Sequence, residues 1–207
     1  MSKDIAVINY GMGNLRSVEN ALLKIGAQPR IVTRPEQVGE ASGLILPGVG
    51  ALRDCVDGLK TAAFDDFIRG WVKEQRPFMG VCLGLQALFE HSEEDDVTGL
   101  GVLPGKVVRF KSRPGFKIPH MGWNFAKLQQ EGSPYWEELD PETDRFYFVH
   151  SYHILPEDPS ITLTTTDYDG VFTSSVAVGS LLASQFHPEK SQRNGLQLYA
   201  NFVASCD

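Results

Sequence analysis

The chain has little of several features that mark particular classes of protein. Its 207 residues include three cysteines, without the close spacing of a metal site. No apolar run approaches the roughly 20 residues of a membrane-spanning helix. Basic residues are outnumbered, with 19 against 26 acidic ones and a formal net charge of −7, whereas nucleic-acid binding needs clustered positive charge. We therefore expect no metal site, no membrane partner and no nucleic-acid partner.

Signals for secretion and for phosphate binding are also missing. Residues 1–10 have no cleavable signal pattern and lead directly into a strand. The odd number of cysteines fits a reducing compartment, so we expect a cytoplasmic protein with free thiols. No Walker-type phosphate-binding loop is present, and we expect no cofactor. The acidic run at 93–96 is interpreted as a solvated loop.

What the sequence does contain is an alternation of short apolar runs and helix-like segments. Apolar residues recur at helical spacing in 15–26, where Asn14 is placed to cap a helix and Gly26 to end it. The first part of the chain predicts strands at 4–9, 29–33, 42–48 and 77–82 and helices at 15–26, 64–76 and 83–92. The rest predicts strands at 105–110, 144–155, 160–168 and 175–187 and a closing helix at 191–206.

This order predicts an α/β fold with a central, mostly parallel sheet flanked by helices. Additional antiparallel strands are expected in the second half, because strand-like segments there follow one another across turn residues. The sequence has no repeat, linker or low-complexity segment. Residues 1–207 are therefore predicted to form a single domain.

Cys82 lies where a predicted strand passes into a predicted helix, between Gly80 and Gly84. The carboxyl edge of a parallel sheet is where ligands bind in such folds. A helix N-terminus favours a thiolate, and small neighbours permit the sharp turn of a nucleophile elbow. A buried cysteine is more often a packing residue, so this position alone leaves both interpretations open. Cys55 and Cys206 are interpreted as ordinary thiols.

A thiol nucleophile needs a base, and His187 is the best-placed histidine. Pro188 favours an extended conformation at the residue before it. In an extended chain His187 and Glu189 lie on the same side, so the carboxylate can orient the ring. The competing interpretation is a surface turn after a strand.

A third segment, PGVG at 47–50, ends an apolar run in a glycine-bearing loop. Backbone N–H groups of such a loop can stabilise a developing oxyanion. The amide of Leu83, directly after Cys82, is the natural second donor. Taken alone, the loop is a weak signal, because glycine and proline are common in loops.

Together these motifs resemble the class I, triad-type glutamine amidotransferases. The set is PGVG (47–50), GVCLGLQ (80–86) and FHPEKS (186–191). Within that family, the chain resembles the glutaminase subunits of imidazole glycerol phosphate synthase, through INYGMGNLRSV (8–18), PHMGWN (119–124) and FYFVHSYH (146–153). The resemblance covers Ile5 to Phe202 and implies the flavodoxin-like amidotransferase fold.

The resemblance implies a role for each site residue. Cys82 attacks the side-chain amide of glutamine to form a thioester, His187 transfers the protons, and Glu189 orients His187. The backbone amides of Val49 and Leu83 hold the oxyanion. The residues that hold the glutamine α-amino and carboxylate groups are Gly50, Gln86, His150, Ser151 and Tyr152.

The same resemblance implies a partner, a cyclase subunit that is a (β/α)8 barrel, in a heterodimer. The cyclase uses the ammonia to form imidazole glycerol phosphate and an aminoimidazole carboxamide ribotide in histidine biosynthesis. Chemistry supports a partner independently, because ammonia released into neutral water is protonated and no longer nucleophilic. By resemblance the interface contains the segment 120–124 and is formed by Asn14, Met121, Trp123 and Lys190. Without the resemblance, we would interpret Trp123 as a core residue rather than as an interface residue.

Regulation and alternatives follow from the same motifs. The PGVG loop lacks a second consecutive glycine, so Val49 is expected to strain the peptide that aims an amide inward. We therefore expect low activity in the isolated chain and stimulation by the liganded cyclase. The alternatives are another amidotransferase glutaminase, such as that of pyridoxal phosphate synthase, a stand-alone γ-glutamyl cysteine hydrolase, and a non-catalytic binding module. The product formed distinguishes a glutaminase from a hydrolase of larger substrates, and an unchanged function in Cys82→Ala would favour the binding module.

Overall fold

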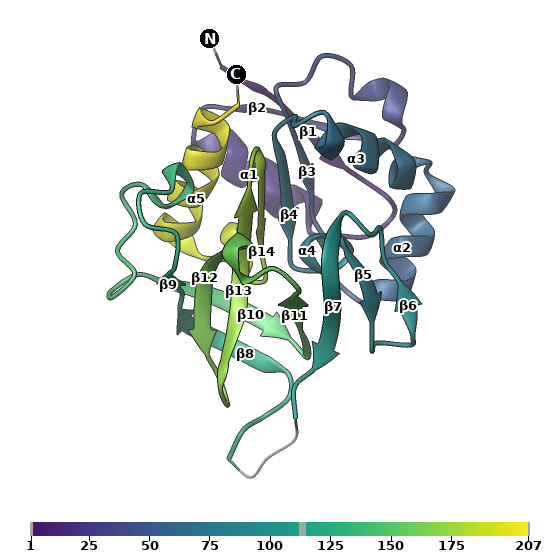
Figure 1. Cartoon of the computed structure of the whole chain (residues 1–207). Helices are drawn as coiled ribbons and strands as arrows, with labels where there is room; N and C mark the ends of the chain where they lie inside the picture. The colour runs from purple at the N-terminus through teal and green to yellow at the C-terminus, as the bar shows by residue number, and fades with distance from the viewer. Residues whose placement is uncertain (1, 112–114, 207) are drawn as a thin grey trace.

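The structure is a computed structural model that describes residues 2–111 and 115–206. A large sheet crosses the molecule, with helices on both faces (Figure 1). The elements of the first part are β1 (Asp4–Ile8), α1 (Leu15–Lys24), β2 (Gln28–Val32), β3 (Gly43–Leu46), α2 (Leu52–Thr61), α3 (Phe64–Lys73), β4 (Phe78–Val81) and α4 (Leu83–Gln86).

The second part is mostly β-structure and ends in a helix. Its elements are β5 (Phe89–Ser92), β6 (Val97–Thr98), β7 (Leu103–Arg109), β8 (His120–Phe125), β9 (Lys127–Leu128), β10 (Arg145–His150), β11 (Tyr152–Pro156), β12 (Thr162–Asp167), β13 (Val171–Val178), β14 (Leu181–Ser184) and α5 (Gln192–Ala204). The expected antiparallel strands in the second half are confirmed.

The centre of the sheet is parallel, in the order β2-β1-β3-β4-β14. This is the flavodoxin-like order, in which the crevice for a ligand lies beyond the carboxyl ends of the strands. All four residues of β3, β4 and β14 are buried, as expected when helices cover both faces. The predicted α/β fold is therefore confirmed.

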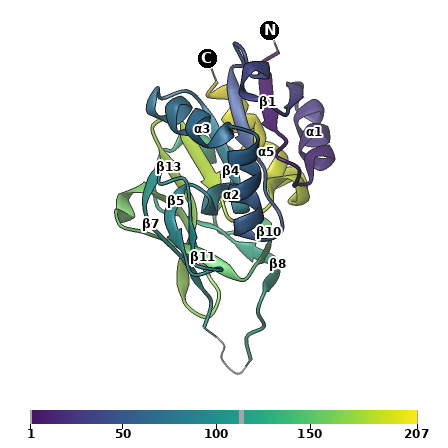
Figure 2. The same cartoon turned by 90° about the vertical axis from the view of Figure 1, so that its right-hand side faces the viewer.

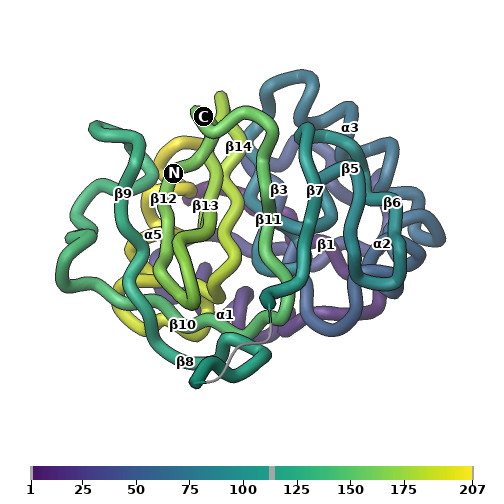
Figure 3. Tube along the Cα trace, turned by 60° about the horizontal axis from the view of Figure 1, so that its bottom comes forward, coloured from purple at the N-terminus to yellow at the C-terminus, as the bar shows by residue number. Residues whose placement is uncertain are grey.

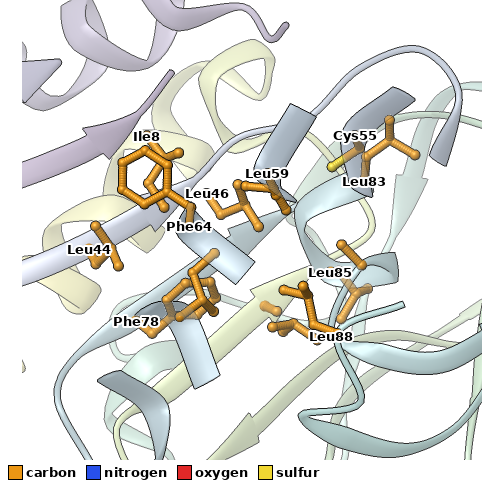
Figure 4. Packing of buried hydrophobic residues seen from close by; sticks show 14 of the residues in the cluster. Ile8, Leu44, Leu46, Cys55, Leu59, Phe64, Phe78, Leu83, Leu85 and Leu88 are labelled. Carbon is orange, nitrogen blue, oxygen red and sulfur yellow. The ribbon is translucent and has the colours of Figure 1, made fainter. Parts of the chain in front are cut away.

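Two hydrophobic cores lie on the two faces of the parallel strands. One core packs β1, β3 and β4 against α2 and α3, and it includes Cys55 and Phe64 (Figure 4). The other packs the opposite face against α1 and α5, which lie together on the far side of the sheet from α2 and α3 (Figure 2). Cys206 is fully buried in that second core. The interpretation of Cys55 and Cys206 as packing residues agrees with these positions.

The predicted helix at 83–92 is wrong beyond Gln86, because α4 ends there and Phe89–Ser92 form strand β5. The carbonyl of Ala87 accepts the amide of Leu100 at 2.7 Å, and the carbonyl of Leu88 accepts that of Val102 at 2.8 Å. These amides, distant in the sequence, replace the donors that a helix would supply four residues further along the chain. Composition alone does not reveal them.

Three smaller expectations differ from the structure. The single strand expected at 175–187 is divided between β13 and β14, which form an antiparallel pair. Asn14 precedes α1, but its side chain makes no capping hydrogen bond there. The single strand expected at 144–155 is two strands in two sheets, since β10 pairs with β8 whereas β11 pairs with β7 and β13. Ser151 forms the corner between them. In the described residues, no helix combines the length and apolarity that crossing a membrane requires.

Candidate active site

Cys82 occupies a strained turn at the carboxyl end of β4. Its φ of 54° and ψ of −104° lie outside the regions that most side chains adopt. The turn is possible because its neighbours are glycines: a Cβ on Gly84 would lie 2.0 Å from the Leu46 carbonyl oxygen. One on Gly80 would lie 2.7 Å from the carbonyl oxygen of Gly84. The backbone thus holds Cys82 in a nucleophile elbow, and such strain concentrates at functional sites.

Strand β14 brings His187 to the same edge of the sheet. It runs parallel to β4 with Ser184 opposite Val81, so both strands end at the same level. The Cys82 amide donates to the Ser184 carbonyl at 2.8 Å, which ties the two strand ends together. His187 follows three residues later in an extended conformation. Two residues far apart in the sequence therefore meet because two parallel strands are neighbours.

Glu189 orients the His187 ring, as the sequence predicted. The distance between His187 Nδ1 and Glu189 Oε1 is 2.8 Å, and both side chains are almost completely buried. With Nδ1 donating to the carboxylate, Nε2 is the nitrogen that remains for Cys82, whose sulfur acts on the charge of the ring. This arrangement is the one that a nucleophile, a base and an orienting carboxylate require.

The charges around His187 favour its protonated form. Burial by itself would lower the pKa of His187, but the adjacent Cys82 sulfur and then the Glu189 carboxylate outweigh it and raise the pKa to about 10. A histidine with that pKa is an imidazolium at neutral pH. An imidazolium beside the sulfur suits a cysteine that acts as a nucleophile.

A cavity of about 420 Å³ opens onto this group. Ten of the residues singled out from the sequence line it: Val49, Gly50, Cys82, Leu83, Gln86, His150, Ser151, Tyr152, His187 and Lys190. Glu189 stands behind His187, and Asn14, Met121 and Trp123 lie elsewhere. The structure therefore brings the expected catalytic, oxyanion and substrate residues to one cavity.

The PGVG loop packs directly on the turn that follows Cys82. A Cβ on Gly48 would lie 2.6 Å from the Cβ of Leu83, so this glycine permits the close approach. The left-handed position of the loop falls on Gly50, with φ of 100°, and not on Val49. The expectation of strain at Val49 itself is therefore not met in this conformation, because glycine takes the unusual angle.

Two residues of the site were missed in the sequence. Gln185 is fully buried, and its Nε2 lies 3.7 Å from the Cys82 sulfur. Its signal was its position between the end of strand β14 and His187, two residues before that histidine. Glu94 adds a carboxylate to the cavity wall, and its Oε2 accepts the Leu52 amide at 3.0 Å. Burial raises the pKa of Glu94, which is half-buried. The other residues of this acidic turn, Glu93, Asp95 and Asp96, are exposed, as expected of a solvated loop.

The residues expected at a partner interface are divided between surface and cavity. Met121 is 61% exposed and Trp123 is 44% exposed on β8, an outer strand that pairs with β10 (Figure 3). Trp123 is therefore not a core residue. Lys190 lines the cavity, and Asn14 is half-buried before α1. His120 is 3% exposed and faces inward, because alternate residues of a strand face opposite sides.

Comparisons with known proteins agree with the motifs and the geometry. The family model for class-I glutamine amidotransferases matches residues 6–206. The imidazole glycerol phosphate synthase subunit HisH of Synechococcus sp. (strain JA-3-3Ab) is 46% identical, covering 96% of this chain and 92% of that protein. The HisH subunit of Thermosynechococcus vestitus is 48% identical, covering 97% and 96%.

Solved structures show the same fold at low sequence identity. The structure of PurLQS from Thermotoga maritima matches all of both chains with a TM-score of 0.78 and 19% identity. A glutamine amidotransferase from Thermotoga maritima covers 91% of this chain and 77% of its own, with a TM-score of 0.63 and 18% identity. The chain therefore belongs to the class-I glutamine amidotransferases and, within them, to the HisH subunits of imidazole glycerol phosphate synthase.

Proposed function

We propose that Cys82, His187 and Glu189 hydrolyse the side-chain amide of L-glutamine. The observation that carries this proposal is the buried His187 ring, held by Glu189 at 2.8 Å, on the wall of the cavity that Cys82 also lines. The sulfur attacks the amide carbon and forms a C–S bond. The carbonyl oxygen becomes an oxyanion, for which the amides of Val49 and Leu83 are the proposed donors.

Collapse of this intermediate breaks the C–N bond. The His187 imidazolium donates its Nε2 proton to the leaving nitrogen, and ammonia departs, leaving a γ-glutamyl thioester. Neutral His187 then takes a proton from water, and the resulting hydroxide attacks the thioester carbon. Glutamate leaves, and the thiolate–imidazolium pair is restored. Glu189 keeps the ring in one tautomer through both steps.

The cavity wall suits an α-amino acid. Burial raises the pKa of the Glu94 carboxyl because its charge is poorly solvated there. The α-ammonium group of a bound amino acid would stabilise that charge as an ion-pair partner. Gly50, Gln86 and the corner formed by His150, Ser151 and Tyr152 line the same space. We assign these residues to the α-amino and α-carboxylate groups of glutamine.

The proposed partner is the cyclase subunit of imidazole glycerol phosphate synthase, a (β/α)8 barrel that receives the ammonia. Met121 and Trp123 expose apolar surface on β8, which suits a docking face. We place this reaction in the cytoplasm, where thiols stay reduced. The unit that carries it is proposed to be one domain, residues 1–207.

The test replaces Cys82 with alanine and measures glutamate release in the complex with the cyclase subunit. We expect a loss of at least roughly 10³-fold, because alanine cannot form the thioester. Cys206→Ala is the matched control, since Cys206 is a buried thiol in the core beside α5. Residual activity in Cys82→Ala equal to that of the control would refute the proposal. Cleavage of a larger γ-glutamyl substrate but not of free glutamine would favour the stand-alone hydrolase instead.

A further inference from the structure

Two histidines outside the triad form a buried pair. His120 Nδ1 lies 3.0 Å from His150 Nε2, and the two side chains belong to residues that are 3% and 6% exposed. The His120 ring is stacked between Tyr168, at 3.9 Å between centroids, and Phe148, at 4.7 Å. Such a pair is costly to bury unless every ring nitrogen has a partner.

The direction of each hydrogen bond follows from the main-chain groups at the two ends. The Tyr152 carbonyl lies 2.7 Å from His150 Nδ1 and can only accept, so His150 carries its proton there. His150 Nε2 then accepts from His120 Nδ1. His120 Nε2 is left to accept from Asn124 Nδ2, at 3.3 Å. Both rings are therefore assigned as neutral, with the proton on Nδ1.

The orientation of Asn124 is independently determined. Its Nδ2 donates to the Asp167 carbonyl at 3.0 Å, and its Oδ1 accepts the Phe125 amide at 2.8 Å. Reversing the amide would place two acceptors together at Asp167 and two donors together at Phe125. The chain of hydrogen bonds therefore runs in one direction, from Asn124 through His120 and His150 to Tyr152.

The same carbonyl continues the chain to the nucleophile. Tyr152 O also accepts from Gln86 Nε2 at 3.0 Å, and the second Gln86 N–H donates to Gln185 Oε1 at 3.0 Å. Gln185 Nε2 in turn donates to the Cys82 sulfur at 3.7 Å. The side chains of Gln86, Gln185 and Cys82 are all buried. An uninterrupted set of hydrogen bonds thus joins β8 to the reacting atom.

The surroundings of the pair disfavour a proton on either ring. Burial lowers the pKa of His120 to about 4. Burial, and after it the charges of His120, His153 and His187, lower the pKa of His150 to about 3 despite the bond to Tyr152. Two titratable groups face the pair within the aromatic cluster: Tyr168 stacks on His120, and His153 packs against Phe110. On the side of the cavity, the titratable and charged groups are Glu94, His187 and Lys190.

We propose that His120 is a positioning residue for glutamine hydrolysis: through His150 it holds the Tyr152 carbonyl and hence the amides of Gln86 and Gln185 beside Cys82. This inference rests on the proposed function of the cavity. It also gives β8 a connection to the site. Met121 and Trp123 lie on the outer face of this strand and His120 on its inner face, so docking that shifts the strand also shifts His120.

The test is His120→Phe, measured in the complex with the cyclase subunit. Phenylalanine keeps the stacking on Phe148 and Tyr168 but removes both ring nitrogens, which leaves His150 Nε2 as a buried acceptor without a donor. We expect KM for glutamine to rise about tenfold while kcat changes by less than about threefold. The ratio of activity with the cyclase to activity without it should fall by a similar factor.

His153→Phe is the matched control. His153 packs in the same aromatic cluster, 4.8 Å from Phe110, but its ring lies within hydrogen-bond distance of the neighbouring Ile154 carbonyl rather than of the chain that leads to Cys82. We expect KM, kcat and the stimulation to stay within about twofold of the unmodified protein. If His120→Phe behaves as this control does in a complex that hydrolyses glutamine, the positioning role is wrong. If the unmodified complex does not hydrolyse glutamine at all, the proposed function itself is wrong.

A second measurement needs no variant. In ¹⁵N-histidine-labelled complex, NMR should show His120 and His150 as neutral Nδ1–H tautomers at pH 7, with no titration above about pH 5. An imidazolium or an Nε2–H tautomer at either residue would break the chain of hydrogen bonds and refute the inference, even if His120→Phe fails to fold.

Discussion

At the scale of single residues, the site depends on charges held close together out of water. Glu189 and His187 are both buried, and the pKa of His187 is raised to about 10 by Cys82 and then Glu189, against the effect of burial. A raised pKa means that the pair stabilises the fold fully below the ordinary value of 6.5 and that this contribution is lost as the pH rises through about 10. The nucleophile and the base thus stabilise each other.

Glu189→Gln should separate these effects. A neutral amide cannot stabilise the imidazolium, so the pKa of His187 falls and the wrong tautomer becomes accessible. We expect kcat to fall by roughly 10²- to 10⁴-fold and the alkaline limb of the kcat/KM–pH profile to move to lower pH. The measurement is glutamate release in the complex across a pH series. An unchanged alkaline limb would show that Glu189 does not tune the ring.

At the scale of elements, the decisive feature is the tight junction between β4 and α4. Gly80, Gly84 and the strained Cys82 let the chain reverse directly above the end of β3. Interiors are packed as densely as organic crystals, so no space remains for an added methyl group at such a junction. The elbow therefore depends on glycine as much as on cysteine.

Gly84→Ala tests this dependence. Its Cβ would lie 2.0 Å from the Leu46 carbonyl oxygen, a main-chain atom that cannot rotate away. We expect a loss of about 3 kcal/mol in the free energy of unfolding, which corresponds to a fall in Tm of roughly 6–12 °C for a chain of this size. Scanning calorimetry measures both.

Gly70→Ala is the matched control, because it lies inside α3 with nothing within 4 Å of the added Cβ. Alanine favours a helix over glycine by up to about 1 kcal/mol, so this variant should be slightly more stable. Equal melting temperatures for the two variants would contradict the proposed crowding at the junction.

At the scale of the whole molecule, function requires a partner to receive a product that water would inactivate. The exposed side chains of Met121 and Trp123 lie on β8, while the cavity opens at the same edge of the sheet as the ends of β4 and β14. A partner docked on β8 would lie beside the cavity, because Val149 and His150 of the paired strand β10 line its wall. Large aromatic residues at such positions are frequent anchors of interfaces.

Trp123→Ala should therefore weaken binding of the cyclase subunit. We expect the dissociation constant to rise roughly 30-fold, the effect of losing a central aromatic anchor. Leu23→Ala is the control, since Leu23 is an apolar residue with 57% exposure near the end of α1. Isothermal titration calorimetry measures both variants against the unmodified chain. Identical affinities would exclude Trp123 from the interface.

Local sequence determined the parts of this protein that depend on neighbours in the chain. Alternating apolar runs and helical periodicity predicted the strands and helices around the parallel sheet, and the spacing of His187 and Glu189 predicted their shared side. Cys82 was a candidate nucleophile because Gly80 and Gly84 flank it in the sequence, although this position alone left a packing role open. These features follow from backbone sterics over a few residues.

Only the tertiary structure decided the contacts that join distant segments. The segment after Gln86, expected to be helical, is a strand because backbone amides near residue 100 donate hydrogen bonds to its carbonyl groups. Gln185 and Glu94 enter the site, and His120 turns inward, because neighbouring strands and loops provide their partners. Hydrogen bonds and burial between segments far apart in the chain depend on the packed arrangement of the sheet, and no local pattern records them.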